Sequence, residues 1–353
     1  MKTINCKDYN IHINDWASFG NYISDINPTS VFVLVDENTE RYCLYNVMEN
    51  LASPFTVIRI SSGEQNKNLI SSQFVWTELM RNGADRHSLL INLGGGVIGD
   101  LGGFCAATYM RGINFIQVPT TLLSQVDACI GGKLGIDLMG FKNMVGLIKN
   151  PDAVFVFTDF LKTLPAQHIK SGFAELLKHG LIADKEAWLQ LTATKSFEAI
   201  DYENLVYESL EIKKNVTEQD PNEKGIRKIL NFGHTIGHAI ETYWMDSRTP
   251  LLHGEAIAIG MISEAYISYR VGNISESELF GIRQSILKLY GHHPKFVKPT
   301  QEIMKIMTGD KKNYAGEIRF SLLEAIGKAT FDITVNDNMI EDSFLFYKEK
   351  IKY

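Results

Sequence analysis

The chain has 353 residues, of which 45% are hydrophobic and 22% charged, so it is an ordinary globular sequence long enough for two domains. Its 35 basic and 41 acidic side chains give a net charge of −6, which argues against general nucleic-acid binding, so an anionic ligand needs a local group of Lys and Arg. The four cysteines are scattered, and neither a signal peptide nor a membrane-spanning apolar run is recognisable, so we expect a cytoplasmic protein.

The chain up to Pro165 alternates between strand and helix patterns. An opening strand and a helix around residues 16–23 precede a continuous apolar run at 31–35, which is typical of a buried parallel strand. Further strands are predicted at 55–60, 88–93, 115–118 and 153–157, and helices at 40–50, 68–82 and 99–108. This alternation predicts an α/β domain with a parallel sheet covered on both faces.

Helical patterns dominate after Pro165. Helices are predicted at 168–181, 185–192, 202–218, 226–243, 254–271 and 275–289, and a hairpin at 318–323 and 328–333. Ser275 followed by Glu278 is a capping-box signature for the start of the last helix. We therefore predict two domains, an α/β domain at 1–165 and a mainly α-helical domain at 166–353.

A glycine-rich segment follows one of the apolar strands. Gly94, Gly96 and Gly99 satisfy Gly-x-Gly-x-x-Gly between a strand and a helix, where backbone N–H groups bind a pyrophosphate. The alternative is a turn whose glycines serve close packing, and the motif lies later in the chain than the usual dinucleotide fingerprint. Asp36 is placed either to accept hydrogen bonds from a ribose or to cap the next helix, and both interpretations are equally supported.

Other polar groups point to an anionic ligand. Residues 62–67 and 119–121 follow predicted strands, where open α/β sheets bind ligands, although each stretch is also compatible with an ordinary loop. Several basic residues occur in apolar or glycine-rich surroundings, which is unusual for solvated surface charges, namely Arg111, Lys133, Lys142, Lys178 and Arg227. Together they fit a ligand that carries a phosphate and a carboxylate.

Three histidines occur close together in the helical half. His234 and His238 are four residues apart and share one helix face, and His253 opens the next apolar helical run. With Glu175 upstream, they form a candidate ligand set for zinc or a similar divalent ion. Any single histidine of this kind is more often a core or capping residue, but three within one short stretch favour a shared partner.

These residues and their order resemble the 3-dehydroquinate synthase family of sugar-phosphate cyclases over nearly the whole chain. The matching blocks are Gly-Glu-Gln-x-Lys at 63–67, Gly-Gly-Gly-Val-Ile-Gly-Asp-Leu-Gly-Gly-Phe at 94–104, Thr-Tyr-Met-Arg-Gly at 108–112, Val-Pro-Thr-Thr-Leu-Leu-Ser-Gln-Val-Asp at 118–127, Gly-Gly-Lys at 131–133, Lys-Asn-Met-Val-Gly at 142–146, Ala-Glu-Leu-Leu-Lys-His-Gly at 174–180 and the two histidine blocks. The resemblance implies a Rossmann-like NAD-binding domain followed by a helical domain that binds metal and substrate.

The resemblance also implies roles for individual residues. The implied metal ligands are Glu175, His234 and His253, with His238 contacting substrate instead. The implied NAD site comprises Asp36, Glu64, Lys67, Gly96, Val97, Ile98, Gly99, Asp100, Thr120, Thr121, Lys133, Lys142, Phe160, Leu161, Lys162 and Thr163. The implied substrate contacts are Asp127, Lys133, Asn143, Lys178, Lys213, Arg227, Asn231, His238 and one of Lys311 or Lys312. Arg111 would reach the phosphate site of a neighbouring subunit, which implies a homodimer.

The implied reaction is the conversion of 3-deoxy-D-arabino-heptulosonate 7-phosphate to 3-dehydroquinate and phosphate, a step of the shikimate pathway. It requires NAD, which is reduced and reoxidised within one turnover, and a divalent metal such as zinc or cobalt. Three stretches depart from the family pattern, namely Leu134, residues 147–150 and Pro221. They fall in loops near the implied site, so we expect effects on kinetics and affinity rather than on the reaction type.

Three alternatives remain open at this point. A metal-dependent polyol dehydrogenase of the glycerol dehydrogenase type would release NADH and would not need so many basic residues. A sister cyclase would make an inosose or a valiolone, although the combination of Lys213, Arg227, Asn231 and His238 favours a substrate that bears a carboxylate. A non-catalytic nucleotide-binding module with a structural metal would bind NAD without turnover.

Overall fold

The computed structural model describes residues 1–139, 141–194, 196–197, 200–245, 247, 249–293, 301–308 and 318–349. The chain forms two compact units, the first made of Met1–Ile169 with Asp201–Glu218 and the second of Lys170–Ile200 with Gln219–Tyr353. Helix α8 (Tyr202–Gln219) therefore belongs with the first unit, although it follows the expected boundary at 165/166. The assignment of NAD binding to one domain and of metal and substrate binding to the other stays a prediction.

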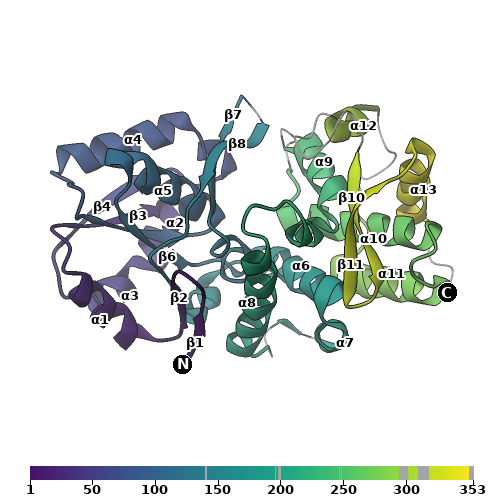
Figure 1. Ribbon diagram of the computed structural model, residues 1–353, viewed down its shortest axis with the longest axis horizontal. Helices are drawn as coiled ribbons and strands as arrows, with labels where there is room; N and C mark the ends of the chain where they lie inside the picture. Colours follow the sequence, from purple (N-terminus) through teal and green to yellow (C-terminus); the bar gives the residue numbers. More distant parts are fainter. Residues whose placement is uncertain are drawn as a thin grey trace. The chain divides into compact units, whose positions relative to one another are not determined.

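The first unit is built on a seven-stranded sheet with the order β1-β2-β9-β6-β5-β3-β4 (Figure 1). Its strands are β1 (Lys2–Asn5), β2 (Asn10–Ile13), β3 (Val31–Asp36), β4 (Phe55–Ile60), β5 (Leu89–Gly94), β6 (Asn114–Pro119) and β9 (Ala153–Val156). Neighbouring strands from β2 to β4 are parallel, and β1 pairs antiparallel with β2. The predicted parallel α/β sheet is thus confirmed.

Both faces of this sheet are buried, which explains the continuous apolar strands. Along β3, Val33 and Val35 belong to one buried cluster, whereas Phe32 and Leu34 belong to a second cluster on the opposite face. The helices of this unit are α1 (Trp16–Ile26), α2 (Glu37–Tyr42), α3 (Leu44–Glu49), α4 (Leu69–Arg81), α5 (Gly96–Thr108) and α8. Alternate residues of a strand therefore support different helix layers.

Two features of the first unit differ from the sequence-based expectation. The helix predicted at 40–50 is broken into α2 and α3 at Cys43, whose backbone leaves the helical region (φ −122, ψ −31) while its side chain is buried in the core. A separate antiparallel pair, β7 (Lys133–Leu138) and β8 (Phe141–Ile148), was not anticipated. Glycines and lysines in this stretch obscure the strand pattern.

The second unit is mainly helical, as predicted. Its elements are α6 (Ala166–Ala183), which begins in the first unit, α7 (Lys185–Ala193), α9 (His234–Trp244), α10 (His253–Arg270), α11 (Glu276–Tyr290), α12 (Gln301–Thr308), α13 (Asp337–Lys348) and the hairpin of β10 (Arg319–Ala325) and β11 (Lys328–Thr334). The predicted hairpin is confirmed, and so is the capping box, in which Ser275 and Glu278 exchange hydrogen bonds. Helix α10 contacts α9, α11, α13 and β10, so it is the central element of this unit.

The prediction of one continuous helix at 226–243 is wrong. A 3₁₀ helix, η6 (Ile226–Asn231), ends with Phe232 as its C-cap. Gly233 then adopts a left-handed conformation (φ 78), and α9 starts only at His234. The break lies where α9 crosses α10. A Cβ on Gly260 would lie 1.9 Å from the Gly233 carbonyl oxygen and 2.9 Å from the Gly237 nitrogen, so the two backbones touch at this crossing.

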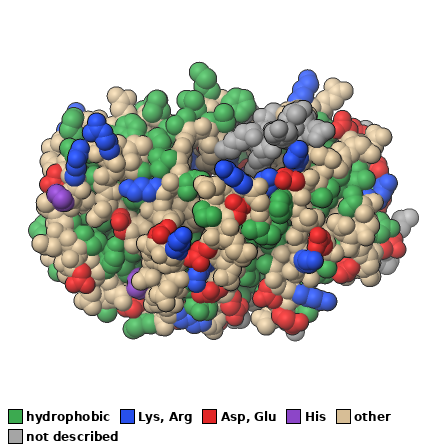
Figure 2. All heavy atoms as spheres, in the orientation of Figure 1, with side chains coloured by type: hydrophobic (Ala, Val, Ile, Leu, Met, Phe, Trp, Pro, Cys, Tyr) green, Lys and Arg blue, Asp and Glu red, His purple; other side chains and the backbone are tan. Residues whose placement is uncertain are grey.

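Among the described helices, none combines the length and the apolar character that crossing a membrane requires. On the face shown in Figure 2, basic and acidic side chains are interspersed.

The helix crossing gives a stability prediction. Replacing Gly260 by Ala forces the α9 and α10 backbones apart, and we expect it to lower the free energy of unfolding by about 3 kcal/mol or more. Gly281→Ala in α11 is the matched control, because a Cβ there meets no atom within 4 Å and should raise helix stability by about 1 kcal/mol. Urea unfolding measures both changes, and equal effects of the two substitutions would contradict the described crossing.

Candidate metal and nucleotide sites

Two helix starts bring three imidazoles together in the second unit. His234 is the first residue of α9, His238 follows one turn later, and His253 is the first residue of α10. One ring nitrogen from each lies within 4.8 Å of the others. The ring centroids are 5.0, 5.5 and 5.6 Å apart. The structure thus brings together the three histidines that the sequence singled out.

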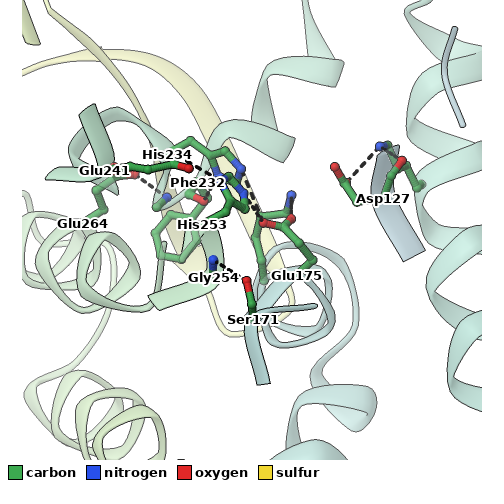
Figure 3. A network of polar contacts seen from close by, with 12 residues as sticks. Asp127, Ser171, Glu175, Phe232, His234, Glu241, His253, Gly254 and Glu264 are labelled. Atoms are coloured by element: carbon green, nitrogen blue, oxygen red, sulfur yellow. Dashed lines mark hydrogen bonds and ion pairs between the residues drawn. The ribbon is translucent and has the colours of Figure 1, made fainter. Parts of the chain in front are cut away.

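A buried carboxylate faces two of these rings. Glu175 on α6 is 0% exposed, and its Oε1 atom lies 3.5 Å from His234 Nε2 and 3.3 Å from His253 Nε2. Its other oxygen forms an ion pair with Lys178, which is 1% exposed. Figure 3 shows Glu175 directed towards both imidazoles. Three helices therefore converge on one polar centre.

The hydrogen-bond partner of Nδ1 in each ring determines which ring nitrogen carries the hydrogen. His234 Nδ1 lies 3.1 Å from the Phe232 carbonyl oxygen, and His253 Nδ1 lies 3.2 Å from Glu241 Oε2. Because both partners only accept hydrogen bonds, the hydrogen of each neutral ring lies on Nδ1, and its Nε2 lone pair faces Glu175. Two lone pairs and a carboxylate oxygen that point at one another need a cation or a proton between them.

The spacing of these atoms suits a tetrahedral metal ion. Ligand atoms bound at about 2.0–2.1 Å with tetrahedral angles lie about 3.4 Å apart, which matches the 3.3 and 3.5 Å separations. Glu241 contacts His253 in the way that a carboxylate outside the ligand set often orients a metal-bound imidazole. The donor set therefore fits a divalent ion such as zinc or cobalt.

The charges around His253 support this fit. Burial lowers the pKa of His253, but Glu241 and Glu175 raise it more, so that the pKa is raised overall to about 10. The surroundings thus favour a positive charge at this ring. A divalent ion supplies that charge without a proton on Nε2.

Local packing holds His253 next to Glu175. The Gly254 nitrogen donates a 2.9 Å hydrogen bond to Ser171 Oγ, and a Cβ on Gly254 would lie 1.9 Å from the Ser171 carbonyl oxygen. Only glycine fits between α10 and α6 at this point. Because Ser171 and Glu175 are one turn apart on α6, this contact sets the approach of His253 to the carboxylate.

Further predicted residues lie on η6 in the same unit. Arg227 is buried, and its guanidinium donates to the Pro221 carbonyl at 2.7 Å, while Asn231 donates to Glu223 at 2.7 Å. The acceptor that orients Arg227 is thus the backbone carbonyl of Pro221, one of the positions that depart from the family pattern. Lys228 pairs with Asp332 of β11 at 2.7 Å, which anchors η6 to the hairpin. The predicted contact from Lys311 or Lys312 lies outside the described residues.

In the first unit, the predicted nucleotide residues follow the carboxyl ends of four adjacent parallel strands. Asp36 ends β3, residues 62–67 follow β4, the glycine segment follows β5, and Thr120 and Thr121 follow β6. The chain runs outward from β3 to β4 on one side and from β5 to β6 on the other. The carboxyl edge between β3 and β5 is therefore a topological switch point, where open α/β sheets bind ligands.

The structure shows both of the alternative roles that the sequence left open here, a glycine needed for close packing and an aspartate that caps a helix. A Cβ on Gly94 would lie 2.4 Å from the Ile98 side chain, so that glycine is required where α5 folds over β5. Asp36 caps α2 by accepting from the nitrogens of Asn38 and Thr39 at 2.9 and 2.8 Å. Helix α5 begins at Gly96 after Gly95, which offers no capping side chain. Nucleotide binding by these residues stays a prediction.

A buried lysine organises the loops around this edge. Lys67 is 4% exposed and binds Asp100 at 2.6 Å and the Asn143 side chain at 2.7 Å. Burial lowers the pKa of Lys67, but Asp100 and Glu64 raise it more, so the ammonium stays charged. Glu64 is 3.7 Å from Lys142. Five predicted residues from three segments of the chain are thus brought together.

Asp137 is a residue of this group that sequence reasoning missed. Its nitrogen donates to the Lys67 carbonyl at 2.8 Å, and its Oδ1 accepts from the Asn143 nitrogen at 2.7 Å. Asn143 has a left-handed backbone (φ 53), which this bond supports. Asp137, Glu241 and Glu223 were all missed because each acts through a partner residue and belongs to no recognisable sequence motif. For Glu241 a signal existed, since it lies one turn after His238.

The remaining predicted residues are dispersed. Lys213 on α8 pairs with Asp127 at 2.9 Å within the first unit. Lys133 and Arg111 are exposed. Phe160 and Leu161 are buried, so Lys162 and Thr163 or the backbone are the groups of that segment available to a ligand. Leu134, the first departure, is buried against Gly103 of α5, where a Cβ would lie 2.4 Å from it.

Comparison with known proteins identifies the family. The family model for the 3-dehydroquinate synthase N-terminal part matches residues 57–171, and the model for the C-terminal part matches residues 172–313. The 3-dehydroquinate synthase of Parabacteroides distasonis is 38% identical over 354 residues, covering 99% of this chain and 98% of the relative.

Solved structures agree with the fold. A 2-deoxy-scyllo-inosose synthase complexed with carbaglucose-6-phosphate, NAD+ and Co2+ has a TM-score of 0.85 at 27% identity, covering 97% of this chain and 98% of that one. A 2-epi-5-epi-valiolone synthase from Streptomyces hygroscopicus subsp. jinggangensis, with NAD+ and Zn2+ bound, has a TM-score of 0.81 at 23% identity, covering 98% of both chains, and supports the fold alone. The chain belongs to the 3-dehydroquinate synthase family.

Proposed function

We propose that this chain is a 3-dehydroquinate synthase, an NAD- and metal-dependent lyase that converts 3-deoxy-D-arabino-heptulosonate 7-phosphate to 3-dehydroquinate and phosphate. The observation that carries the proposal is the convergence of Glu175, His234 and His253, with both imidazoles held in the metal-binding tautomer. The family supports the substrate, because curated relatives that carry this name are 38% and 39% identical over most of the chain.

The two bound groups supply the reactive chemistry. NAD supplies reversible hydride transfer, and zinc or cobalt supplies Lewis-acid polarisation of a hydroxyl oxygen. Glu175, His234 and His253 would hold the metal. The nucleotide would bind at the switch point of the sheet, along Asp36, the segment Gly96–Asp100, Thr120 and Thr121. The remaining NAD contacts predicted from the sequence are part of the same proposal.

The protein side chains would bind and orient the two anionic ends of the substrate. Lys178 and Arg227 are buried cations, and the Pro221 carbonyl orients the guanidinium of Arg227. Asn231 and His238 would add hydrogen bonds beside them. The ion pair of Asp127 and Lys213 holds a carboxylate and an ammonium next to each other, and this pair would take up or return a proton at a substrate hydroxyl.

Assembly and location are part of the same proposal. Arg111 is exposed on a short 3₁₀ turn, so its guanidinium is available to a partner. We infer that it binds the substrate phosphate of a second subunit in a homodimer. The enzyme would act in the cytoplasm.

The reaction can be tested with traces of NAD. We expect free phosphate to be released from the heptulosonate phosphate in many-fold excess over NAD, without lasting NADH, because the cofactor is regenerated in each turnover. Exhaustive chelation should abolish phosphate release, and added zinc or cobalt should restore it. Stoichiometric NADH would indicate a polyol dehydrogenase instead. Phosphate release from glucose 6-phosphate alone would indicate a sister cyclase, and activity that survives chelation would exclude the metal role.

The role of Glu241 gives a second prediction. Glu241→Gln keeps the size of the side chain but removes the charge that holds His253 Nδ1–H, so metal affinity should fall about 10- to 100-fold. Competition with a chromophoric chelator measures this affinity. Glu324→Gln is the matched control, because Glu324 pairs with Lys328 in the hairpin of the same unit and is expected to leave affinity unchanged. Wild-type affinity in Glu241→Gln would contradict the assignment.

A further inference from the structure

Helix α9 starts without a capping group of its own. Its N-cap residue is Gly233, which has no side chain, and its third residue is Ile236, which has no acceptor. In an ordinary capping box, the N-cap side chain binds the backbone N–H of the third residue, and the side chain of the third residue binds the N-cap N–H. Neither half of that exchange is possible from within this segment.

A carboxylate on the neighbouring helix makes both of these hydrogen bonds. Glu264 of α10 accepts from the Ile236 nitrogen at 3.0 Å through Oε1 and from the Gly233 nitrogen at 2.6 Å through Oε2. These are the two N–H groups that a local capping box would satisfy. Glu264 lies 28 and 31 residues further along the chain, so the cap is supplied by tertiary packing (Figure 3).

Because Glu264 is buried, its carboxylate has to be stabilised by groups of the protein instead of water. The residue is 0% exposed, and a carboxylate removed from water is costly unless hydrogen bonds and favourable dipoles replace its hydration. The N-terminus of α9 offers both, because its first N–H groups lack helical partners and carry the positive end of the helix dipole. Capping side chains at solvent-exposed helix starts do not carry this desolvation cost.

Tight packing explains why the cap comes from α10. A Cβ on Gly233 would lie 2.7 Å from the Met261 side chain and 3.1 Å from the Met261 nitrogen, and its φ of 78 is itself strained for other residues. The N-cap position therefore cannot carry Ser, Thr, Asp or Asn without displacing α10. Met261 and Glu264 are one turn apart on the same helix, so the close contact that excludes a local cap also places the distant one.

The capped backbone is the one that carries a proposed metal ligand. His234 lies between the two N–H groups that Glu264 binds, and the Phe232 carbonyl, which orients the His234 ring, belongs to the peptide unit that also contains the Gly233 nitrogen. A shift of this backbone would move both the ring and the acceptor of its Nδ1–H. Positions of metal ligands tolerate only small errors before affinity falls.

We propose that Glu264 is a positioning residue for the metal site and that it holds His234 in its ligand orientation by capping α9 from α10. This inference rests on the proposed role of His234 as a metal ligand. Glu264 does not touch the metal in this account, and its effect is transmitted through the backbone of residues 232–236.

The test is Co²⁺ binding to the metal-depleted full-length protein, followed through the visible d–d absorption of the bound ion. Glu264→Gln retains the shape of the side chain but turns an amide NH₂ towards one of the two N–H groups. We expect it to weaken Co²⁺ binding about 10-fold or more and to change the d–d band. Glu264→Ala, which leaves both N–H groups without the cap, should have a larger effect.

Ser268→Ala is the matched control for general destabilisation. Ser268 is buried on the same helix and makes two hydrogen bonds, to the Glu264 carbonyl at 2.7 Å and from the Leu323 nitrogen of β10 at 3.0 Å, away from the start of α9. This variant should lower the melting temperature while its Co²⁺ affinity and spectrum stay as in the wild type.

The outcomes separate this inference from the proposed function. If the wild type binds one Co²⁺ and both Glu264 variants match its affinity and spectrum, the positioning role is wrong and the metal site stands. The positioning role is also wrong if Ser268→Ala weakens Co²⁺ binding as much as Glu264→Gln. If the wild type binds no Co²⁺ at all, the metal site and the proposed function fall, and the positioning role falls with them.

Discussion

The central constraint in this molecule is a set of hydrogen-bond acceptors that face one another in a buried place. Glu175 Oε1 lies 3.5 Å from His234 Nε2 and 3.3 Å from His253 Nε2, and the Nδ1 atom of each ring is bound to an acceptor. Such an arrangement is repulsive unless a cation or a proton lies among the three atoms. The proposed chemistry of this centre follows from the need to place a positive charge there.

The helical unit is arranged to keep these three groups in place. Glycines at two crossings let backbones touch, with Gly254 against α6 and Gly260 against α9. Each approach brings a helix start, and with it a histidine, towards the buried carboxylate. Other helices supply part of the capping at those helix starts, since Ser171 binds the Gly254 nitrogen and Glu264 caps α9. Tight packing and polar satisfaction therefore depend on the same residues.

Much of the fold and part of the candidate site were predictable from local sequence patterns. The apolar runs at β3 and β4 marked the sheet, and the spacing of His234 and His238 marked one helix face, because both signals repeat within a few residues. The break between η6 and α9 was not predictable, since the apolar period continues through Phe232 and Gly233 and only the crossing with Gly260 requires the turn. Glu264 and Asp137 were not predictable either, because each acts through a partner distant in sequence or on a backbone group. Glu241 was overlooked, although it lies one helical turn after His238. The choice between His238 and Glu175 as a ligand could not be made from spacing and came from the family resemblance.

Anomalous diffraction at the zinc absorption edge, from a crystal of the zinc-loaded protein, tests the central claim most directly. The account predicts one strong peak at about 2.0–2.2 Å from Glu175 Oε1, His234 Nε2 and His253 Nε2. A zinc-saturated crystal in which these three atoms turn away from one another, with no anomalous peak among them, would contradict it.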